Sequence, residues 1–275
     1  MTLAEAAAAI AAGDVSSREM TEACLKRMTA LNPKVNALAG LDEADALAQA
    51  DAADVARAKG AALGPLHGVP LAHKDMYYRR GRVSACGSAI RKDFRPDHTA
   101  TALERLDAAG ALDIARLNMV EFAFGVTGHN DVAGTPRNPW NTDHMTGGSS
   151  SGSGVAVASR MCFGALGSDT GGSIRLPAAC CGLVGMKPTY GRVSRFGAMP
   201  LAHSLDTVGP LTRTVRDNAL IMQTIAGHDA NDPVTAGTPV GDYLGGLDKD
   251  VRGLKVGLPE SFFYEDVAPE VRTLV

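Results

Sequence analysis

The amino-acid sequence predicts an α/β fold, with a mixed, largely parallel sheet covered by helices on both faces. Short apolar runs of strand length alternate with longer helical patterns from about residue 64 onward, and this alternation is typical of parallel sheets. Glycine and proline mark the boundaries between these segments, where turns are expected. The 275 residues are 45% hydrophobic and 21% charged, which is enough to bury the core of one large domain or two small ones.

The start of the chain is predicted to be helical. Helices are expected over residues 2–12, from Ser16 to the Asn32-Pro33 pair, and over about residues 42–59. Ser16 and Glu19 have the spacing of a capping box, and the apolar residues that follow recur at helical intervals. No residue in these three helices is expected to take part in chemistry.

Strands and helices are then predicted to alternate. Strands are expected at 69–73, 111–117, 161–167, 183–187 and 254–258, and helices at 100–109, 150–160, from about 172, and at 214–227. Residues 125–143 are rich in Gly, Asn, Pro and Thr, which indicates a long ordered loop of the kind that is often functional.

Composition argues against several classes of function. The formal net charge of −3 gives no reason to expect nucleic acid or an anionic membrane as a partner. We find no apolar run of the roughly 18 residues that a membrane-spanning helix needs. The five cysteines are an odd number without C-x-x-C spacing, so we expect reduced thiols in the cytoplasm and neither disulfides nor a metal site.

Two glycine–serine clusters, at residues 147–153 and 167–173, are each placed to open a helix. Glycine lets the backbone approach a ligand closely, and the amides of a first helical turn have no intrahelical partner. For either cluster alone, a glycine-rich turn leading into a helix is the plain structural interpretation. For Lys74, which follows the apolar run 69–73, the plain interpretation is an ion pair with Asp75.

Other functions fit the clusters less well. Neither cluster contains the Gly-Lys-Ser/Thr of a phosphate-binding P-loop, and the Rossmann spacing also fails. Residues 148–152 match the G-x-S-x-G pattern of a nucleophile elbow around Ser150, with Asp206 and His228 as nominal partners downstream. Because no sequence feature links those two residues to Ser150, the elbow is a minor alternative.

Several longer motifs resemble the amidase signature family of serine hydrolases. They are GVPLAHKD at 68–75, GGSSSGS at 147–153, GSDTGGSIRLPA at 167–178, GMKPTYGRVS at 185–194 and DTVGPLTR at 206–213. The resemblance covers essentially the whole chain, and the family's spacing holds, with 75 residues from Lys74 to Ser149 and 24 from there to Ser173. Thr146 and Ser151 depart from the proline and glycine that are usual in the family.

The resemblance implies one amidase signature domain over residues 1–275. In this interpretation residues 1–60 form a helical layer and residues 61–275 an incomplete catalytic core. Because family members are longer, the chain corresponds to their N-terminal half to two-thirds, and we expect it to be truncated at the C-terminus.

The resemblance also implies three catalytic roles. Ser173 would be the nucleophile that forms an acyl-enzyme, Ser149, after a cis peptide bond, would relay protons, and Lys74 would be the general base. A serine hydroxyl needs such a base before it can attack. A neutral lysine requires the pKa to fall from about 10.4 toward 7, and burial can supply a shift of roughly 3 units.

The remaining site residues follow from the same resemblance. The backbone amides of residues 170–173 would form an oxyanion hole at a helix start. Ser150 is expected to hydrogen-bond Lys74, and Asp169 to pair with Arg175, although Arg175 could instead bind a substrate carboxylate. The full predicted sets are Thr170, Gly171, Gly172 and Ser173 for the oxyanion hole, and Ala123, Ser149 and Thr170 for substrate binding.

The predicted function is therefore hydrolysis of a carboxylic acid amide to the acid and ammonia or an amine, without metal or cofactor. One alternative is the glutamine-hydrolysing component of a tRNA-dependent amidotransferase, which would need partner subunits. A second is an inactive fragment or binding module. The expected partners are a small amide substrate and, in a free amidase, a second copy of the chain in a homodimer.

Overall fold

The computed structural model describes residues 1–259 and 261–275. Contacts within the chain divide it into two compact units, Met1–Leu244 and Gly245–Val275. The second unit contains helix α8 (Pro269–Leu274), and none of its described residues is buried. The strand predicted at residues 254–258 is wrong, because this exposed segment has no hydrogen-bonded neighbour strand among the described residues.

The first unit is built on a six-stranded sheet with the order β1-β3-β2-β4-β6-β5 in the described part of the chain. The strands are β1 (Leu38–Leu41), β2 (Pro70–Lys74), β3 (Leu112–Leu117), β4 (Gly164–Asp169), β5 (Val184–Gly185) and β6 (Thr207–Thr212). β2 pairs in parallel with both β3 and β4, whereas β1 and β6 run antiparallel to their neighbours. Because β5 is antiparallel to β6, it shares the direction of the three central strands, and the prediction of a mixed, largely parallel sheet is confirmed.

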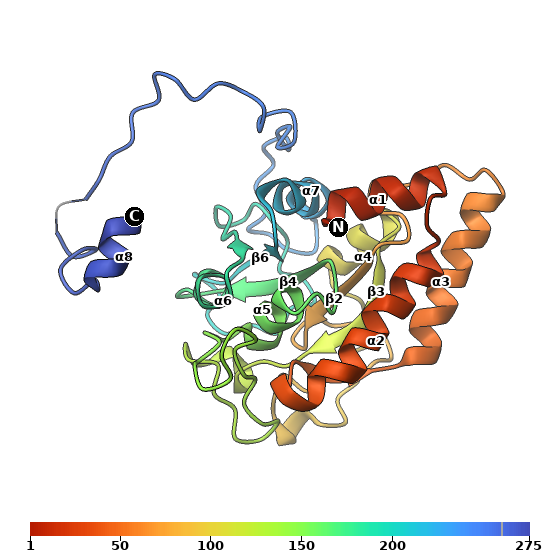
Figure 1. Ribbon diagram of the computed structural model, residues 1–275, viewed down its shortest axis with the longest axis horizontal. Coiled ribbons are helices and arrows are strands. Elements are labelled where there is room, and N and C mark those ends of the chain that lie inside the picture. Colours follow the sequence, from red (N-terminus) through yellow and green to blue (C-terminus); the bar gives the residue numbers. More distant parts are fainter. Residues whose placement is uncertain (260) are drawn as a thin grey trace. The chain divides into compact units, whose positions relative to one another are not determined.

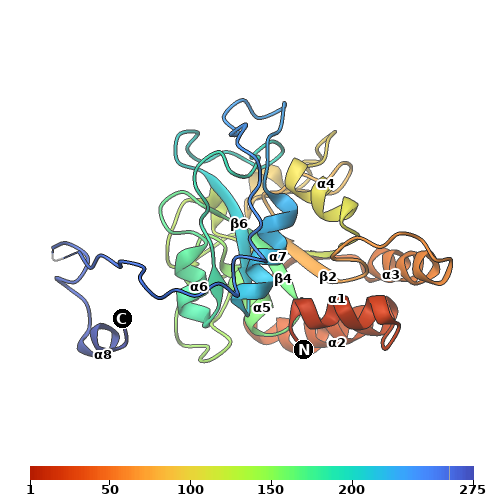
Figure 2. The same cartoon turned by 90° about the horizontal axis from the view of Figure 1, so that it is seen from above.

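Helices surround this sheet in Figures 1 and 2. In the first unit they are α1 (Leu3–Ala12), α2 (Ser17–Val35), α3 (Glu43–Ala58), α4 (Thr101–Ala108), α5 (Ser151–Ala158), α6 (Arg175–Cys181) and α7 (Val215–Ile225). Figure 1 shows α1 beside α7, and α2 beside α3, in agreement with their tertiary contacts.

The hydrophobic core has two main parts, one on each face of the sheet. Side chains of α1, α4 and α7 pack with Leu71 and Leu166, while side chains of α2, α3 and α5 pack with Ala72 and Ala165. Since adjacent residues of a strand point to opposite faces, the two clusters lie on opposite sides. β2 and β4 are buried along their whole length, as expected for central parallel strands.

Two features of the N-terminal region differ from the prediction. Residues 38–41 form the edge strand β1, which their short, weakly patterned sequence did not indicate. Helix α2 continues through Pro33 to Val35 and ends at Asn36, whose φ of 50° is left-handed. The capping box of Ser16 and Glu19 is present as predicted.

None of the helices in the described residues is both long and apolar enough to cross a membrane.

Candidate active site

The predicted catalytic residues come from three neighbouring segments. Lys74 is the last residue of β2, Ser149 lies just before α5, and Ser173 lies between β4 and α6. β2 and β4 are adjacent and parallel, so their carboxyl ends meet at one edge of the sheet, where active sites of α/β proteins form. The fold therefore brings the two glycine–serine clusters together beside Lys74.

Lys74 is buried, with 1% of its surface exposed, and lies among hydroxyl groups. Its Nζ donates to Ser149 Oγ at 2.7 Å and to Ser168 Oγ at 2.8 Å. The expected ion pair with Asp75 does not form, because Asp75 pairs instead with Arg116 at 3.0 Å. The only polar atoms that hold this amino group in the described residues are thus two neutral oxygens.

Burial lowers the pKa of Lys74 from 10.5 to about 7. The carboxylates of Asp169 and Asp206 act in the opposite direction but are outweighed. Such a lysine is largely neutral at moderately alkaline pH and can accept a proton, which a lysine in water cannot do.

The backbone connects Ser149, the predicted proton relay, to the predicted nucleophile. The Gly148–Ser149 peptide bond is cis, as the sequence resemblance implied. Ser149 is fully buried, and the amide of the next residue, Ser150, donates to the carbonyl of Ser173 at 3.3 Å. Ser173 is 6% exposed, and its hydroxyl makes no hydrogen bond to any described residue, so it is not held by a competing partner.

Asp169 organises the loop that carries Ser173. It accepts hydrogen bonds from the amides of Gly172 at 2.8 Å and Ile174 at 3.2 Å, and it pairs with Arg175 Nη2 at 2.9 Å. Burial alone would raise the pKa of Asp169, but the hydrogen bonds from Arg175 and the loop amides outweigh it and lower the pKa. The predicted Asp169–Arg175 pair is confirmed.

In the loop that the sequence predicts to form an oxyanion hole, one of the four amides is already engaged. Because the Gly172 N–H is engaged by Asp169, it does not point freely outward. The amides of Thr170, Gly171 and Ser173 have no acceptor among the described residues. A Cβ added at Gly171 would meet no protein atom within 4 Å. The space beside Gly171 is therefore open, and packing against the rest of the protein does not require a glycine at this position.

The predicted hydrogen bond between Ser150 and Lys74 is wrong. Ser150 Oγ instead donates to the carbonyl of Ser168 and accepts from its amide, both at 3.3 Å. Ser168, which the sequence analysis did not single out, takes the place beside the amino group. The sequence indicates Ser168 only by its position in the second cluster, one residue before Asp169. Which hydroxyl lies beside Lys74 is decided by the pairing of β2 with β4.

Ala123, predicted to bind substrate, lies in a short turn that follows a backbone contact with Ser149. The turn is a single 3-10 segment, Glu121–Ala123, in which Phe122 and Ala123 have left-handed φ angles of 49° and 62°. Such angles are uncommon outside glycine and occur often at functional sites. Just before it, the amide of Val120 donates to the Ser149 carbonyl at 3.1 Å.

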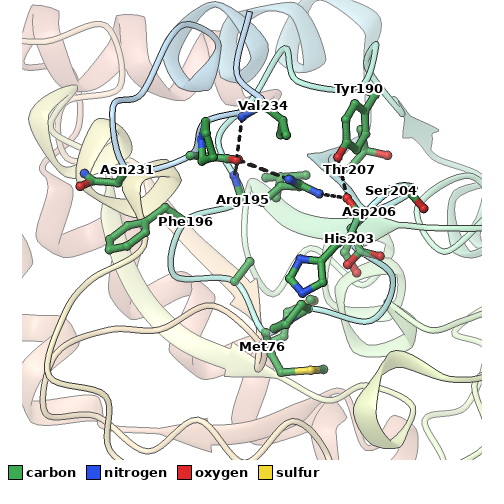
Figure 3. Close-up of a pocket in the computed structure, with 17 residues that line it drawn as sticks. Met76, Tyr190, Arg195, Phe196, His203, Ser204, Asp206, Thr207, Asn231 and Val234 are labelled. Atoms are coloured by element: carbon green, nitrogen blue, oxygen red, sulfur yellow. Dashed lines mark hydrogen bonds and ion pairs between the residues drawn. The ribbon is translucent and has the colours of Figure 1, made fainter.

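A cavity of about 580 Å³ is lined in part by Ser168, the second hydroxyl partner of Lys74. Figure 3 shows this cavity with Met76, Phe196 and Asp206 among its labelled lining residues. Its wall is largely apolar, with Met76, Phe196 and Val208 among the lining residues. Arg195 also lines it, with its guanidinium 4.8 Å from the centre of the Tyr190 ring.

A family model described as Amidase matches residues 19–275 of this sequence. The chain belongs to the amidase family. The A subunit of the glutamyl-tRNA(Gln) amidotransferase of Pelobacter propionicus is 47% identical to this amidase-family chain over 272 residues, which are 99% of the chain and 56% of that protein. The chain therefore spans about half the length of the curated relatives that it matches.

Solved structures agree with this assignment. The chain is 40% identical to the native peptide amidase of Stenotrophomonas maltophilia, with a TM-score of 0.86 over 90% of the chain and 53% of the amidase. The chain is also 39% identical to one chain of a vestigial protein complex described as revealing the evolutionary origins of an s-triazine catabolic enzyme. The two structures match with a TM-score of 0.96 over 99% of this chain and 60% of the other. The predicted family and fold are confirmed.

Proposed function

We propose that this amidase-family chain supplies the acyl-transfer chemistry of an amide hydrolase. Ser173 is the nucleophile, Ser149 the proton relay and Lys74 the general base. The observation that supports this most strongly is a buried lysine with its pKa lowered to about 7 and a serine hydroxyl 2.7 Å from its nitrogen. A perturbed base in hydrogen-bond contact with a hydroxyl is the arrangement that activates a serine.

The first half of the reaction forms an ester. Ser173 Oγ attacks the amide carbonyl carbon while its proton passes to Ser149, whose own proton passes to Lys74. The carbonyl oxygen becomes an oxyanion, and the free amides of Thr170, Gly171 and Ser173 are placed to stabilise it. Collapse of this intermediate breaks the C–N bond, and the leaving nitrogen takes a proton back through Ser149.

The second half releases the acid. Water attacks the acyl ester of Ser173, with the same base and relay accepting its proton. The hydroxyl of Ser173 is then regenerated, and the net products are a carboxylic acid and ammonia or an amine. The turn at Ala123, together with Ser149 and Thr170, borders the substrate in this proposal. Every step uses side chains and amides of this chain.

Covalent labelling tests the proposal. A fluorophosphonate probe should attach to Ser173 in the purified parent, and Ser173→Ala and Lys74→Met should each abolish the label. Ser153→Ala is the matched control, because the hydroxyl of this buried serine donates to the Leu166 carbonyl at 3.1 Å and not to any of the proposed catalytic groups. Ser173→Ala turning over a panel of aliphatic, aryl and glutamine amides at the parental rate would contradict the assignment.

A second candidate is the glutamine-hydrolysing component of a tRNA-dependent amidotransferase, favoured by the 47% identity to a protein of that name. Ammonia release from glutamine should then be weak in the isolated chain and rise when partner subunits are added. A free amidase would release ammonia from simple amides unaided. No labelling at Ser173 and no turnover under either condition would indicate an inactive fragment or a binding module.

A further inference from the structure

Lys74 has a second hydroxyl partner that the proposed reaction does not use. Its Nζ lies 2.8 Å from Ser168 Oγ, nearly the same distance as the 2.7 Å to Ser149 Oγ. Ser168 is buried on β4, at the point where the strand meets the proposed oxyanion loop. The amino group is therefore shared between one hydroxyl that leads toward Ser173 and one that does not.

We propose that Ser168 is a positioning residue that aims the lone pair of Lys74 at Ser149. A neutral amino group has two N–H donors and one lone pair, and it rotates about its C–N bond. When Ser168 Oγ accepts a hydrogen bond from one N–H, rotation about the C–N bond is restricted, and the directions of the lone pair and of the second N–H are fixed relative to Ser149. This inference rests on the proposed function, because it assigns a direction to the proton transfer in that reaction.

Hydrogen bonds link the backbone of Ser168 to the segment that carries Ser149. Ser150, the residue after Ser149, bonds both the amide and the carbonyl of Ser168 through its single hydroxyl. Gly167, the residue before Ser168, is also held, because its carbonyl accepts a hydrogen bond from the hydroxyl of the buried Tyr77. The separation of the two hydroxyls is thus set by hydrogen bonds on either side of Ser168, and Lys74 fits between them.

Loss of the Ser168 oxygen has two consequences. The neutral amine could donate to Ser149 instead of accepting from it, and the proton would then have no base to receive it. The ammonium form would also lose one of its two acceptors, so the pKa of Lys74 would fall further. The other ionisable groups that act on Lys74 are the thiol of Cys86, which follows β2, and the carboxylates of Asp169 at the end of β4 and Asp206 before β6; all three stay in place in the variants below.

The test measures the pKa of Lys74 directly, by NMR of the full chain with lysine labelled at the ε-carbon. Lys74→Met assigns the resonance by removing it. Ser168→Ala should lower the pKa of Lys74 by about one to two units, the size expected for one hydrogen bond to a charged group. Ser168→Thr, which keeps the hydroxyl at a position that lines the adjoining cavity, should keep the parental value, as should the control Ser153→Ala.

The rate of fluorophosphonate labelling at Ser173 is the second readout. It should fall about 10- to 100-fold in Ser168→Ala, the range expected from misaligning a reacting group, and stay near the parental rate in Ser168→Thr. Should Ser168→Ala fail to fold, Ser168→Cys provides the same comparison, because sulfur is a weak acceptor of similar size.

Two results would overturn the inference. One is a Ser168→Ala variant, or Ser168→Cys if that variant stands in, whose Lys74 pKa lies within about 0.3 units of that in Ser153→Ala and whose labelling rate lies within twofold of the rate in Ser153→Ala. The other is a Ser168→Thr variant as impaired as Ser168→Ala, which would show that the hydroxyl is not what matters. An unlabelled Ser173 in the parent would instead contradict the proposed function, while the pKa series would still decide whether Ser168 holds Lys74.

Discussion

At the scale of single residues, the site depends on the environment of one lysine. Moving the pKa of Lys74 from 10.5 to about 7 corresponds to about 5 kcal/mol against the charged form. Burial supplies this, because the amino group meets hydroxyls rather than carboxylates. Asp75, its neighbour in sequence, is directed to Arg116 instead, which removes the ion pair that would have kept the lysine protonated.

The pH dependence of labelling follows from this pKa. Only neutral Lys74 accepts the proton of Ser149, so the rate of Ser173 labelling should rise with pH and level off above about 7, the pKa of Lys74. The rate constant is measured by stopped aliquots between pH 5 and 9. A profile that stays flat, or one that rises only near the ordinary lysine pKa, would argue against Lys74 as the base.

Ser151 offers a prediction about stability. It is fully buried, and its hydroxyl has no hydrogen-bond partner among the described residues; it is also a position where the family usually has glycine. Because an unpaired buried hydroxyl costs about 1–3 kcal/mol, Ser151→Ala should raise the free energy of unfolding by about 1 kcal/mol. Urea denaturation measures the free energy of unfolding. Ser153→Ala, which removes the hydrogen bond to the Leu166 carbonyl, should lower that free energy.

At the scale of elements, helix α5 sets the position of Ser149, the proposed relay, by lying very close to the backbone that follows β3. The amide of Gly152, in its first turn, donates to the Asn118 carbonyl at 2.9 Å. The residues from Ser151 to Val157 are all buried. The start of this helix is therefore fixed by backbone contact as well as by side-chain packing.

Gly152→Ala should disturb this contact. A Cβ there would lie 2.4 Å from the Ala37 carbonyl oxygen and 2.5 Å from Asn118 backbone atoms, which cannot move as a flexible side chain can. We expect a loss of about 1–3 kcal/mol in the free energy of unfolding, typical of overpacking. Gly171→Ala is the control, since its Cβ meets no protein atom within 4 Å; equal losses in both variants would contradict the close-approach argument.

At the scale of the whole molecule, two core clusters meet across strand β2, which also carries a buried histidine. His73 is 4% exposed, and its Nδ1 accepts the amide of Leu166 at 3.2 Å. Burial is the main cause that lowers its pKa from 6.5 to about 4, with Asp113 acting against it. The folded state therefore holds a neutral imidazole over a range of pH in which the unfolded chain binds a proton.

This histidine should make global stability depend on pH. The contribution of His73 to the free energy of unfolding is complete above pH 6.5. It is lost as the pH falls from 6.5 through about 4, because over that range the imidazole binds a proton in the unfolded chain but not in the folded one. The 2.5-unit shift corresponds to about 3 kcal/mol over that range. His73→Asn, whose side-chain oxygen can replace Nδ1 as acceptor, should show a shallower loss of unfolding free energy between pH 7 and 4. Parallel curves for parent and variant would contradict the shift.

The sequence by itself determined the fold class, the family and the order of the main elements. Alternating strand and helix patterns, the two glycine–serine clusters and the spacing from Lys74 to Ser149 and Ser173 are local features, and local features are visible in one chain. Helix ends such as the Ser16–Glu19 capping box were predictable for the same reason.

Only the tertiary structure decided which side chains meet. Whether Lys74 contacts Ser150 or Ser168, and whether residues 38–41 join the sheet, depend on strand pairing between distant segments. Whether the Gly172 amide is free depends on how the loop turns back on Asp169, three residues earlier. The depressed pKa of Lys74 is of the same kind, because it comes from burial by elements that are far from residue 74 in sequence. Motifs name the chemical groups, whereas packing sets their distances, their hydrogen-bond partners and their charge.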